Sequence, residues 1–371
     1  MLGRRSLALA VAALVPAMAG CADHQWLGDA HILVDGFDET NLDCRSGLCD
    51  HDENTDLIAF DGAIYLVHRT AESQILGPNS SLRVSRSTDG GTSWALLAVI
   101  PAPTDRDIRD PSFFVIDGQL ALKAITRLPV NSSRDSNVDS VSIVTTSSDG
   151  GATWGPLVAA GPHGWSFWRV RDDNDGVHYS AAYQDGDLAV QLFASQDGMN
   201  WTAGPTIYDV AADTPLETEL VFDAVGVTAL VRMDGTDDEL LGSQGRLRTK
   251  VCTAARPYAT FDCSGELDGV RLDGPVAFGW HGRTFVIARK HLLGVANKKR
   301  TALYELADGA AIEHGELPSA GDTSYAGVAP IGGDRFVATY YSSNLAQDPP
   351  WARAMFGPTD IWQATIDLSH L

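Results

Sequence analysis

A short motif occurs three times in the chain and constrains its fold more than any other feature. Residues 87–94 and 147–154 both read S-x-D-G-G-x-[ST]-W, and residues 195–201 carry a copy that is one residue shorter. In such a segment the Asp and Ser side chains bond backbone N–H groups of a tight turn, and Gly supplies the positive φ that the turn requires. The terminal Trp then packs as a large apolar group. The motif therefore predicts one kind of hairpin at three places.

The spacing of the three copies predicts a β-propeller. The copies begin 60 and 48 residues apart, and each follows an apolar, β-rich run, at residues 82–85, 141–145 and 188–193. Repeats with this period in an all-β chain indicate propeller blades, here of four antiparallel strands each. At roughly 50–60 residues per blade the chain has room for about six, with five and seven as the alternatives. We therefore predict an all-β, six-bladed β-propeller.

Composition agrees with this fold and narrows the class of partner. Hydrophobic residues make up 44% of the 371 residues, charged residues make up 20%, and glycine occurs 36 times. These proportions are typical of a globular protein with many strands and turns. The formal net charge of -21 repels nucleic acid, which we exclude as a partner. His163, His178 and His281 are scattered, so we expect no metal site, and we also expect a monomer without a cofactor.

The first 20 residues have the pattern of a signal peptide. Arg4 and Arg5 precede an apolar stretch at residues 7–17 that is too short to span a bilayer. Residues 17–21 read A-M-A-G-C and resemble a bacterial lipobox, which would make Cys21 the lipidated N-terminus of an envelope protein held at the membrane. Cleavage after Ala19, giving a secreted or periplasmic protein, is the alternative. Both interpretations predict export.

The other four cysteines form two pairs, each close together in sequence, and the first pair lies in a polar N-terminal segment. Residues 21–52 are polar and acid-rich, so we predict a tether that leads into the first strand, with the propeller at residues 53–371. Residues 235–270 show no regular strand pattern. Disulfides persist in oxidising compartments, which favours two disulfides over the alternative of a metal site, since neither pair has C-x-x-C spacing. The two pairs are Cys44 with Cys49 and Cys252 with Cys263.

A second pattern repeats along the predicted blades. The first strand of a blade carries a polar or charged residue, a D-G or G-G turn follows, and the second strand often ends in arginine, as at Arg69, Arg232 and Arg289. First strands line the central channel of a propeller, so we expect these polar side chains to converge near the axis.

The repeated motif is similar to the Asp box, or BNR repeat, of sialidases. The segments between the boxes resemble a bacterial, exo-α-sialidase-like branch of that superfamily, from about residue 53 to the end of the chain. The matching segments are residues 54–58, 65–69, 109–111, 168–170, 215–222, 230–232, 274–275, 317–327 and 340–343. The Asp box indicates architecture, while the ordered set of segments indicates the superfamily.

The resemblance implies a set of catalytic residues in the C-terminal half. Sialidases hold a substrate carboxylate with three arginines and use a Tyr nucleophile activated by a Glu. The order Glu217, Arg232, Arg289 and Tyr325 matches the family's order of Glu, Arg, Arg and Tyr. A neighbouring carboxylate can take the proton of a phenol, and planar guanidinium groups bind a carboxylate in a bidentate manner.

The N-terminal half departs from the family's pattern. The Arg-Ile-Pro of the first strand is absent, and residues 53–56 read E-N-T-D. The third arginine is therefore either Arg69 or Arg109, and the catalytic acid is either Asp56 or Asp110.

Aromatic residues offer one further candidate subsite. Trp168 and Arg169 either line a sugar subsite through ring stacking or fill an interface between blades. The resemblance implies an exported glycoside hydrolase that acts on the acidic or modified terminus of a glycan or glycoconjugate. A surface propeller that binds glycans without catalysis and a purely structural propeller are the alternatives.

Overall fold

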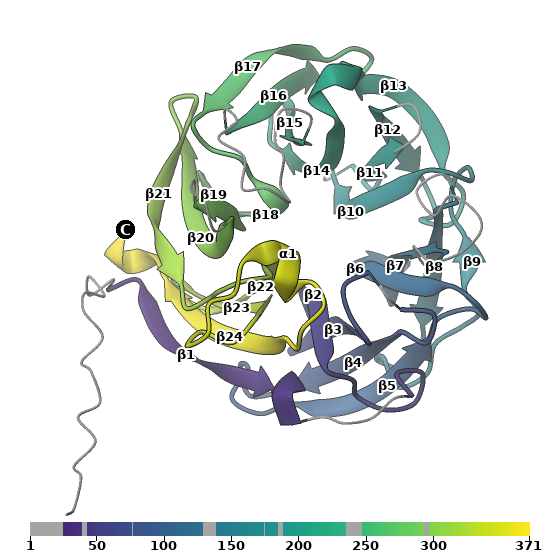
Figure 1. The fold of residues 1–371 in the computed structure, drawn as a ribbon. Helices are drawn as coiled ribbons and strands as arrows, with labels where there is room; N and C mark the ends of the chain where they lie inside the picture. The colour runs from purple at the N-terminus through teal and green to yellow at the C-terminus, as the bar shows by residue number, and fades with distance from the viewer. Residues whose placement is uncertain are drawn as a thin grey trace, which may run out of the picture.

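Six antiparallel sheets of four strands each are arranged around a central axis (Figure 1). This computed structural model describes residues 25–38, 43–75, 77–128, 139–173, 175–184, 188–234, 247–292 and 297–371. It confirms the six-bladed, all-β propeller. The predicted signal peptide at residues 1–20 and Cys21 lie outside the described residues. Across the described ranges, none of the helices has both the length and the apolar character needed to cross a membrane.

Five blades follow one another along the chain, and the sixth combines both ends of it. From the inner to the outer strand, the first blade is β2 (His51–Phe60), β3 (Ala63–Ala71), β4 (Ser81–Ser87) and β5 (Ala95–Pro101), and the second is β6 (Asp107–Ile116), β7 (Gln119–Arg127), β8 (Val141–Ser147) and β9 (Val158–Ala159). The third blade is β10 (Ser166–Asp172), β11 (His178–Gln184), β12 (Ala189–Ser195) and β13 (Thr202–Tyr208), and the fourth is β14 (Pro215–Phe222), β15 (Gly226–Met233), β16 (Arg248–Ala255) and β17 (Asp262–Asp268). The fifth blade is β18 (Asp273–Trp280), β19 (Arg283–Leu292), β20 (Lys298–Ala307) and β21 (Ala310–Leu317), and the sixth is β22 (Thr323–Gly332), β23 (Arg335–Ser342), β24 (Asp360–Asp367) and β1 (Leu27–Val34).

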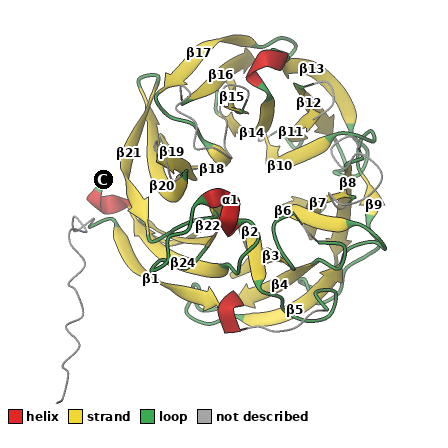
Figure 2. Ribbon diagram, viewed as in Figure 1, coloured by secondary structure: helices red, strands yellow, loops and turns green. Residues whose placement is uncertain are grey.

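Helical structure is sparse. Figure 2 shows one short α-helix, α1 (Trp351–Ala354), near the centre of the ring, in the segment that joins β23 to β24. Short 3-10 helices form at Gly36–Asp38, Ala211–Asp213 and Leu368–His370.

The N-terminal strand closes the ring. β1 pairs antiparallel with β24, with Ala30 opposite Ala364, and it is the outermost strand of the sixth blade. Residues 27–34 and the start of β2 are therefore part of the propeller and not of the tether predicted for residues 21–52. None of the residues of β1 is fully buried, so the strand lacks the apolar alternation by which a strand is recognised in sequence.

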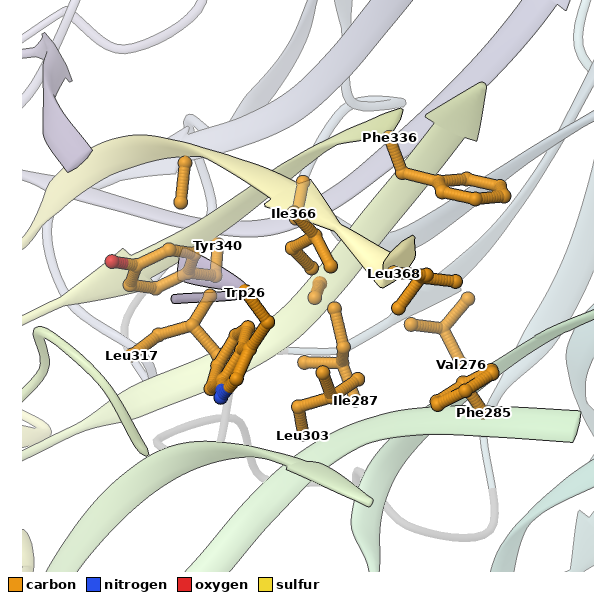
Figure 3. Close-up of a cluster of buried hydrophobic side chains, with 13 residues drawn as sticks. Trp26, Val276, Phe285, Ile287, Leu303, Leu317, Phe336, Tyr340, Ile366 and Leu368 are labelled. Carbon is orange, nitrogen blue, oxygen red and sulfur yellow. The ribbon is translucent and has the colours of Figure 1, made fainter. Parts of the chain in front are cut away.

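Apolar clusters fill the wedges between neighbouring blades. In the cluster of Figure 3, Phe285 and Ile287 of the fifth blade pack near Tyr340 and Ile366 of the sixth, and Trp26 completes the cluster from the N-terminal side. Burying such side chains stabilises a fold by about 1.5–3 kcal/mol each. This packing holds the inner strands in fixed positions around the axis.

The three copies of the repeated motif, called boxes below, occupy the same hairpin, between the third and fourth strands of the first three blades. In the first box Ser87 Oγ accepts from Gly91 N at 2.8 Å, and Asp89 Oδ1 accepts from Ser93 N at 2.9 Å. The second box repeats these two bonds at the same lengths. Trp94 donates to Gln363 Oε1 in the sixth blade at 2.8 Å, so the first box also ties the first blade to the last.

Both predicted disulfides are present. Cys44 bonds to Cys49, and Cys252 bonds to Cys263. The second disulfide joins neighbouring strands β16 and β17, so the expectation that residues 235–270 are irregular was wrong over the two ranges that form these strands. Half-exposed outer strands carry mixed polar residues, which hid the period-2 pattern.

Candidate active site

The first strand of every blade carries a β-bulge at an equivalent position. The register shifts fall between the pairs Glu53/Asp56, Arg109/Ser112, Phe167/Val170, Pro215/Thr218, Asp273/Val276 and Ser324/Gly327. Four of these bulges hold a residue with positive φ, namely Asn54 (53°), Asp110 (51°), Gly274 (55°) and Tyr325 (49°). A bulge re-aims side chains that a regular strand would alternate between faces. The β-bulges of the first strands thus position the side chains that form the site.

A polar cleft of about 180 Å³ lies among these bulges. It brings together five of the predicted site residues: Tyr325, Glu217, Asp110, Arg232 and Arg109. Its other lining residues are Glu53, Asn54, Gln74, Arg127, Tyr183 and Leu216. A smaller cavity of about 10 Å³ adjoins it and shares Asn54, Asp110 and Tyr325 with it.

Tyr325, Glu217 and Arg232 form one hydrogen-bonded group. Tyr325 Oη donates to Glu217 Oε1 at 2.6 Å. Arg232 Nη1 donates to Glu217 Oε2 at 2.7 Å and to Tyr325 Oη at 3.1 Å. The three residues come from the fourth and sixth blades and are all buried. A phenol therefore faces a carboxylate that can receive its proton, with a guanidinium beside both oxygens.

Tyr325 is a neutral phenol in the resting site. Burial and the Glu217 charge raise its pKa well above 10, although Arg232 and Arg289 act in the opposite direction. The proton consequently stays on Tyr325, which donates it in the hydrogen bond to Glu217. A nucleophilic role for Tyr325 requires that proton to pass to Glu217 as the new bond forms.

Arg289 and Trp168 support the Tyr325 ring. The Arg289 guanidinium carbon lies 5.0 Å from the ring centroid, and the Trp168 ring stands edge-on at a centroid distance of 5.8 Å. Arg289 donates to Asp322 Oδ1 at 2.9 Å and to Tyr341 Oη at 2.7 Å. With 1% of its surface exposed, Arg289 does not line the polar cleft.

Asp110 is a buried carboxyl group at the wall of the cleft. Its Oδ1 accepts from Asn54 Nδ2 at 2.6 Å, and its backbone carbonyl accepts from Lys123 Nζ at 2.8 Å. Burial raises the pKa of Asp110; Arg109 opposes this, and the charge of Glu217 adds to it. Asp110 therefore retains its proton to a higher pH than an exposed Asp, which is the property of a general acid.

Asp56 and Arg169 bond to each other and join blades instead of facing the polar cleft. Asp56 Oδ2 accepts from Phe113 N at 2.7 Å, and Arg169 Nη2 donates to the Ala326 carbonyl at 2.6 Å. Both are buried and absent from the cleft lining, although Arg169 and Trp168 touch the smaller cavity.

The two candidates for the third arginine differ in position. Arg69 is completely buried and pairs with Glu53 and Asp107, so its guanidinium does not line the cleft. Arg109 does line the cleft, but it bonds Asp107 Oδ2 through Nε at 2.6 Å and the Gln74 carbonyl through Nη2 at 2.6 Å.

Arg127 also lines the cleft and was not among the predicted site residues. Arg127 is the last residue of β7 and follows the Asp117-Gly118 turn. This is the pattern of a second strand ending in arginine that singled out Arg69, Arg232 and Arg289, and the same signal could have found it.

A buried cluster next to the site has residue types that could hold a metal ion. His51 Nε2 lies 3.3 Å from Glu53 Oε2 and 3.9 Å from Asp322 Oδ2, while His51 Nδ1 contacts the Gly357 carbonyl at 2.7 Å. Burial lowers the pKa of His51, but the hydrogen bond to Glu53 and the charges of Glu53 and Asp322 outweigh this and raise it. The contacts of His51 with Glu53, Asp322 and the Gly357 carbonyl account for the cluster.

Comparisons with solved structures find the same fold in distant proteins. A protein of unknown function from Dyadobacter fermentans has 16% identity and a TM-score of 0.66, over 91% of this chain and 99% of that one. The NanB sialidase from Streptococcus pneumoniae has 12% identity and a TM-score of 0.63, over 88% and 70%. The Trypanosoma rangeli sialidase, solved with sialic acid, has 13% identity and a TM-score of 0.56, over 86% and 55%.

At these identities the likeness establishes a sialidase-like propeller fold. The chain spans about half the length of the Trypanosoma rangeli sialidase. No protein-family model matches the chain, and no curated protein does.

Proposed function

We propose that this chain is an exo-acting glycoside hydrolase with Tyr325 as its nucleophile. The observation that carries the proposal is the hydrogen bond from Tyr325 Oη to Glu217 Oε1, at 2.6 Å, inside a polar cleft. The two residues are 108 positions apart in sequence and come from different blades. Asp110, a carboxyl group whose pKa is raised by burial, lines the same cleft and is the group that we assign as the acid that glycoside cleavage needs.

The first step transfers the sugar to the protein. Tyr325 Oη attacks the anomeric carbon, and its proton moves to Glu217. The bond from the anomeric carbon to the leaving-group oxygen breaks, and that oxygen takes the proton of Asp110. Arg232 Nη1, 3.1 Å from Tyr325 Oη, stabilises negative charge on the phenol oxygen while the proton departs.

The second step releases the sugar. A water molecule gives a proton to the Asp110 carboxylate, and its oxygen attacks the anomeric carbon. The bond to Tyr325 Oη breaks, and Oη recovers its proton from Glu217. Two displacements at one carbon retain the anomeric configuration.

We also propose that the protein is exported and that Cys21 carries the lipid anchor. The two disulfides support an oxidising compartment. Labelling cells with a radioactive fatty acid should mark the protein, and Cys21→Ser should abolish the label. An unlabelled wild-type protein released from the cells would instead support simple signal cleavage.

Turnover tests the enzymatic proposal. The purified protein is incubated with 4-nitrophenyl glycosides of neutral and acidic sugars and with acidic oligosaccharides, alongside its Tyr325→Phe variant. We expect Tyr325→Phe to lower kcat by on the order of 10³-fold or more, because the substitution removes the phenol oxygen that attacks the anomeric carbon. Tyr304→Phe is the matched control, since Tyr304 is a buried phenol in an apolar cluster outside the cleft.

The second candidate function, glycan binding without catalysis, rests on one observation. The arginines of the predicted clamp are engaged by carboxylates of the chain itself, such as Asp322 for Arg289 and Asp107 for Arg109. Binding on a glycan array with no product, unchanged in Tyr325→Phe, would support this candidate. Equal turnover by wild type and Tyr325→Phe would remove Tyr325 from the mechanism.

A further inference from the structure

A buried lysine lies behind the wall of the cleft that carries Asp110. Lys123 is on β7 of the second blade, opposite Ser112 of β6, and 1% of its surface is exposed. Its Nζ donates to the Asp110 carbonyl at 2.8 Å and to the Phe167 carbonyl of the third blade at 2.7 Å. Lysine is almost never fully buried, because removing its charge from water is costly. The position of Lys123 therefore calls for a specific role.

Lys123 restrains the β-bulge in which Asp110 lies. The register of β6 and β7 shifts between Arg109 and Ser112, and Lys123 is the residue opposite the end of that shift. Asp110 has a φ of 51°, which is unfavourable for a residue with a side chain and persists only where the surroundings hold it. The bond from Lys123 to the Asp110 carbonyl is such a restraint, and the bond to Phe167 anchors it in the next blade.

The carboxyl group of Asp110 is held by a different residue. Asn54 of the first blade donates to Asp110 Oδ1 at 2.6 Å. Lys123, Asn54, Asp110 and Tyr325 also line the small cavity beside the cleft, whereas Lys123 does not line the cleft itself. Lys123 is therefore close to the proposed acid but outside the space in which a sugar would lie.

The charge of Lys123 acts on the Asp110 carboxyl group. Burial raises the pKa of Asp110, and the positive charge of Lys123 opposes this. The other charged groups that act on Asp110 are Arg109, Glu217 and Arg127. Without Lys123, Asp110 would hold its proton more tightly.

Lys123 responds to Asp110 in turn. Burial lowers the pKa of Lys123 to about 7, and the charge of Asp110 acts in the opposite direction. The other charged groups that act on Lys123 are Asp56 of β2 and Arg169 and Arg171 of β10. A change in the protonation of either group therefore affects the other.

We infer that Lys123 is a positioning residue for the proposed acid. Its two hydrogen bonds hold the β6 bulge in the conformation that presents Asp110 to the cleft, and its charge eases the release of the Asp110 proton to the leaving group. The inference rests on the proposed function, since Asp110 is the acid of that mechanism. Lys123 itself contacts neither the sugar nor the reacting atoms.

The pH dependence of turnover tests the inference. We compare kcat/KM for an oligosaccharide between wild type and Lys123→Met, whose side chain has a similar length but no charge. The fall in kcat/KM at high pH should move upward by about one pH unit, because Asp110 then keeps its proton longer. Below that pH, kcat should be lower by about 10-fold or more, because the bulge loses its restraint. A fall at the wild-type pH, or at a lower pH, overturns the inference whatever happens to kcat.

Lys290→Met is the matched control. Lys290, on β19 of the fifth blade, is a partly exposed lysine that forms ion pairs with Glu313 and Glu316. Its loss should change neither kcat nor the pH at which kcat/KM falls. Thermal unfolding of each variant shows whether it is folded at the temperature of the assay.

A titration of the protein itself needs neither turnover nor a variant of Lys123. With lysine isotopically labelled at Nζ, nuclear magnetic resonance should show one ammonium group with a midpoint of about 7, as expected for Lys123. In Asp110→Asn this midpoint should fall by about one pH unit, because the charge that favours the ammonium form is lost. Such a shift supports the coupling of Lys123 to Asp110 even if the protein shows no turnover and the proposed function fails. The same midpoint in both proteins overturns the inference and leaves the proposed function standing.

Discussion

The ring of Tyr325 packs directly on the backbone of Gly274. A Cβ added at Gly274 would lie 2.8 Å from Tyr325 Cδ2, and Gly274 has a φ of 55°. The backbone N of Gly274 also donates to Glu217 Oε2 at 3.0 Å. One glycine of the fifth blade thus fixes both the proposed nucleophile and its proton acceptor.

Gly274→Ala should impair activity much more than it impairs stability. The added methyl group displaces the Tyr325 ring, and we expect kcat to fall at least about 10-fold because small displacements of reacting groups are costly. Gly282→Ala is a matched control, since Gly282 also has a positive φ (78°) but has nothing within 4 Å of an added Cβ. Both variants should lose roughly 1–2 kcal/mol of unfolding free energy from backbone strain. Similar kcat values for the two would argue against contact between Gly274 and Tyr325.

Glu217→Gln should abolish proton transfer from Tyr325. A Gln side chain can accept through its oxygen only, so it cannot serve Tyr325 Oη, Arg232 and Gly274 N as both oxygens of Glu217 do, and it cannot take the proton at neutral pH. We expect kcat to fall by about 10²- to 10⁴-fold, with a smaller change in KM. Glu313→Gln, in a peripheral ion pair with Lys290, is the control for loss of one negative charge. Steady-state kinetics on the best substrate of the panel measures both, and wild-type kcat in Glu217→Gln would exclude Glu217 as the base.

Asp110→Asn should show an effect that depends on the leaving group. The amide oxygen can keep the bond from Asn54, but the side chain loses the acidic proton. Hydrolysis of oligosaccharides should fall by roughly 10²- to 10⁴-fold, whereas glycosides with 2,4-dinitrophenol should lose much less. Uniform loss across leaving groups would assign Asp110 a role other than acid.

The pH dependence of activity follows from the same group. The reaction needs the proton of Asp110, and the pKa of this carboxyl group is raised. Wild-type kcat/KM should therefore decline as pH rises through that pKa. The decline should be absent from the residual activity of Asp110→Asn. A pH–rate profile of both proteins with an oligosaccharide, whose leaving group needs the acid, measures this difference.

His51 should make the stability of the propeller depend on pH. Its folded-state pKa is raised above 6.5, so its contribution is fully present below pH 6.5 and is lost as pH rises through the folded-state pKa. In His51→Gln, unfolding free energy should fall by about 3 kcal/mol at pH 6, because Glu53 and Asp322 lose a buried partner. The deficit should shrink toward pH 9. Denaturant titrations at several pH values measure it, with the exposed His163→Gln as control; a deficit independent of pH would mean that His51 is neutral.

Local signals in the sequence were sufficient to predict the architecture. Each copy of the repeated motif is closed by hydrogen bonds within eight residues, such as that between Ser87 and Gly91, so its local structure does not depend on the rest of the fold. Strand β1 was missed because its pairing with β24 depends on residues more than 300 positions away. Its own half-exposed sequence carries little period-2 information.

The candidate site could be predicted from the sequence only in part. The order of Glu217, Arg232 and Tyr325 follows from the resemblance, and these residues meet in one group. The engagement of Arg289 by Asp322 and of Arg69 by Glu53 depends on how bulged strands aim their side chains. Arg127 ends a second strand as Arg69, Arg232 and Arg289 do, so the pattern could have named it, but the pattern does not show which of these arginines face the cleft.

Ring closure by β1 also sets the timing of folding. Leu27 lies opposite Ile366, so the first strand to leave the ribosome has no partner until nearly the whole chain has been synthesised. A nascent chain can complete the earlier blades one by one, but the cyclic structure cannot form during translation.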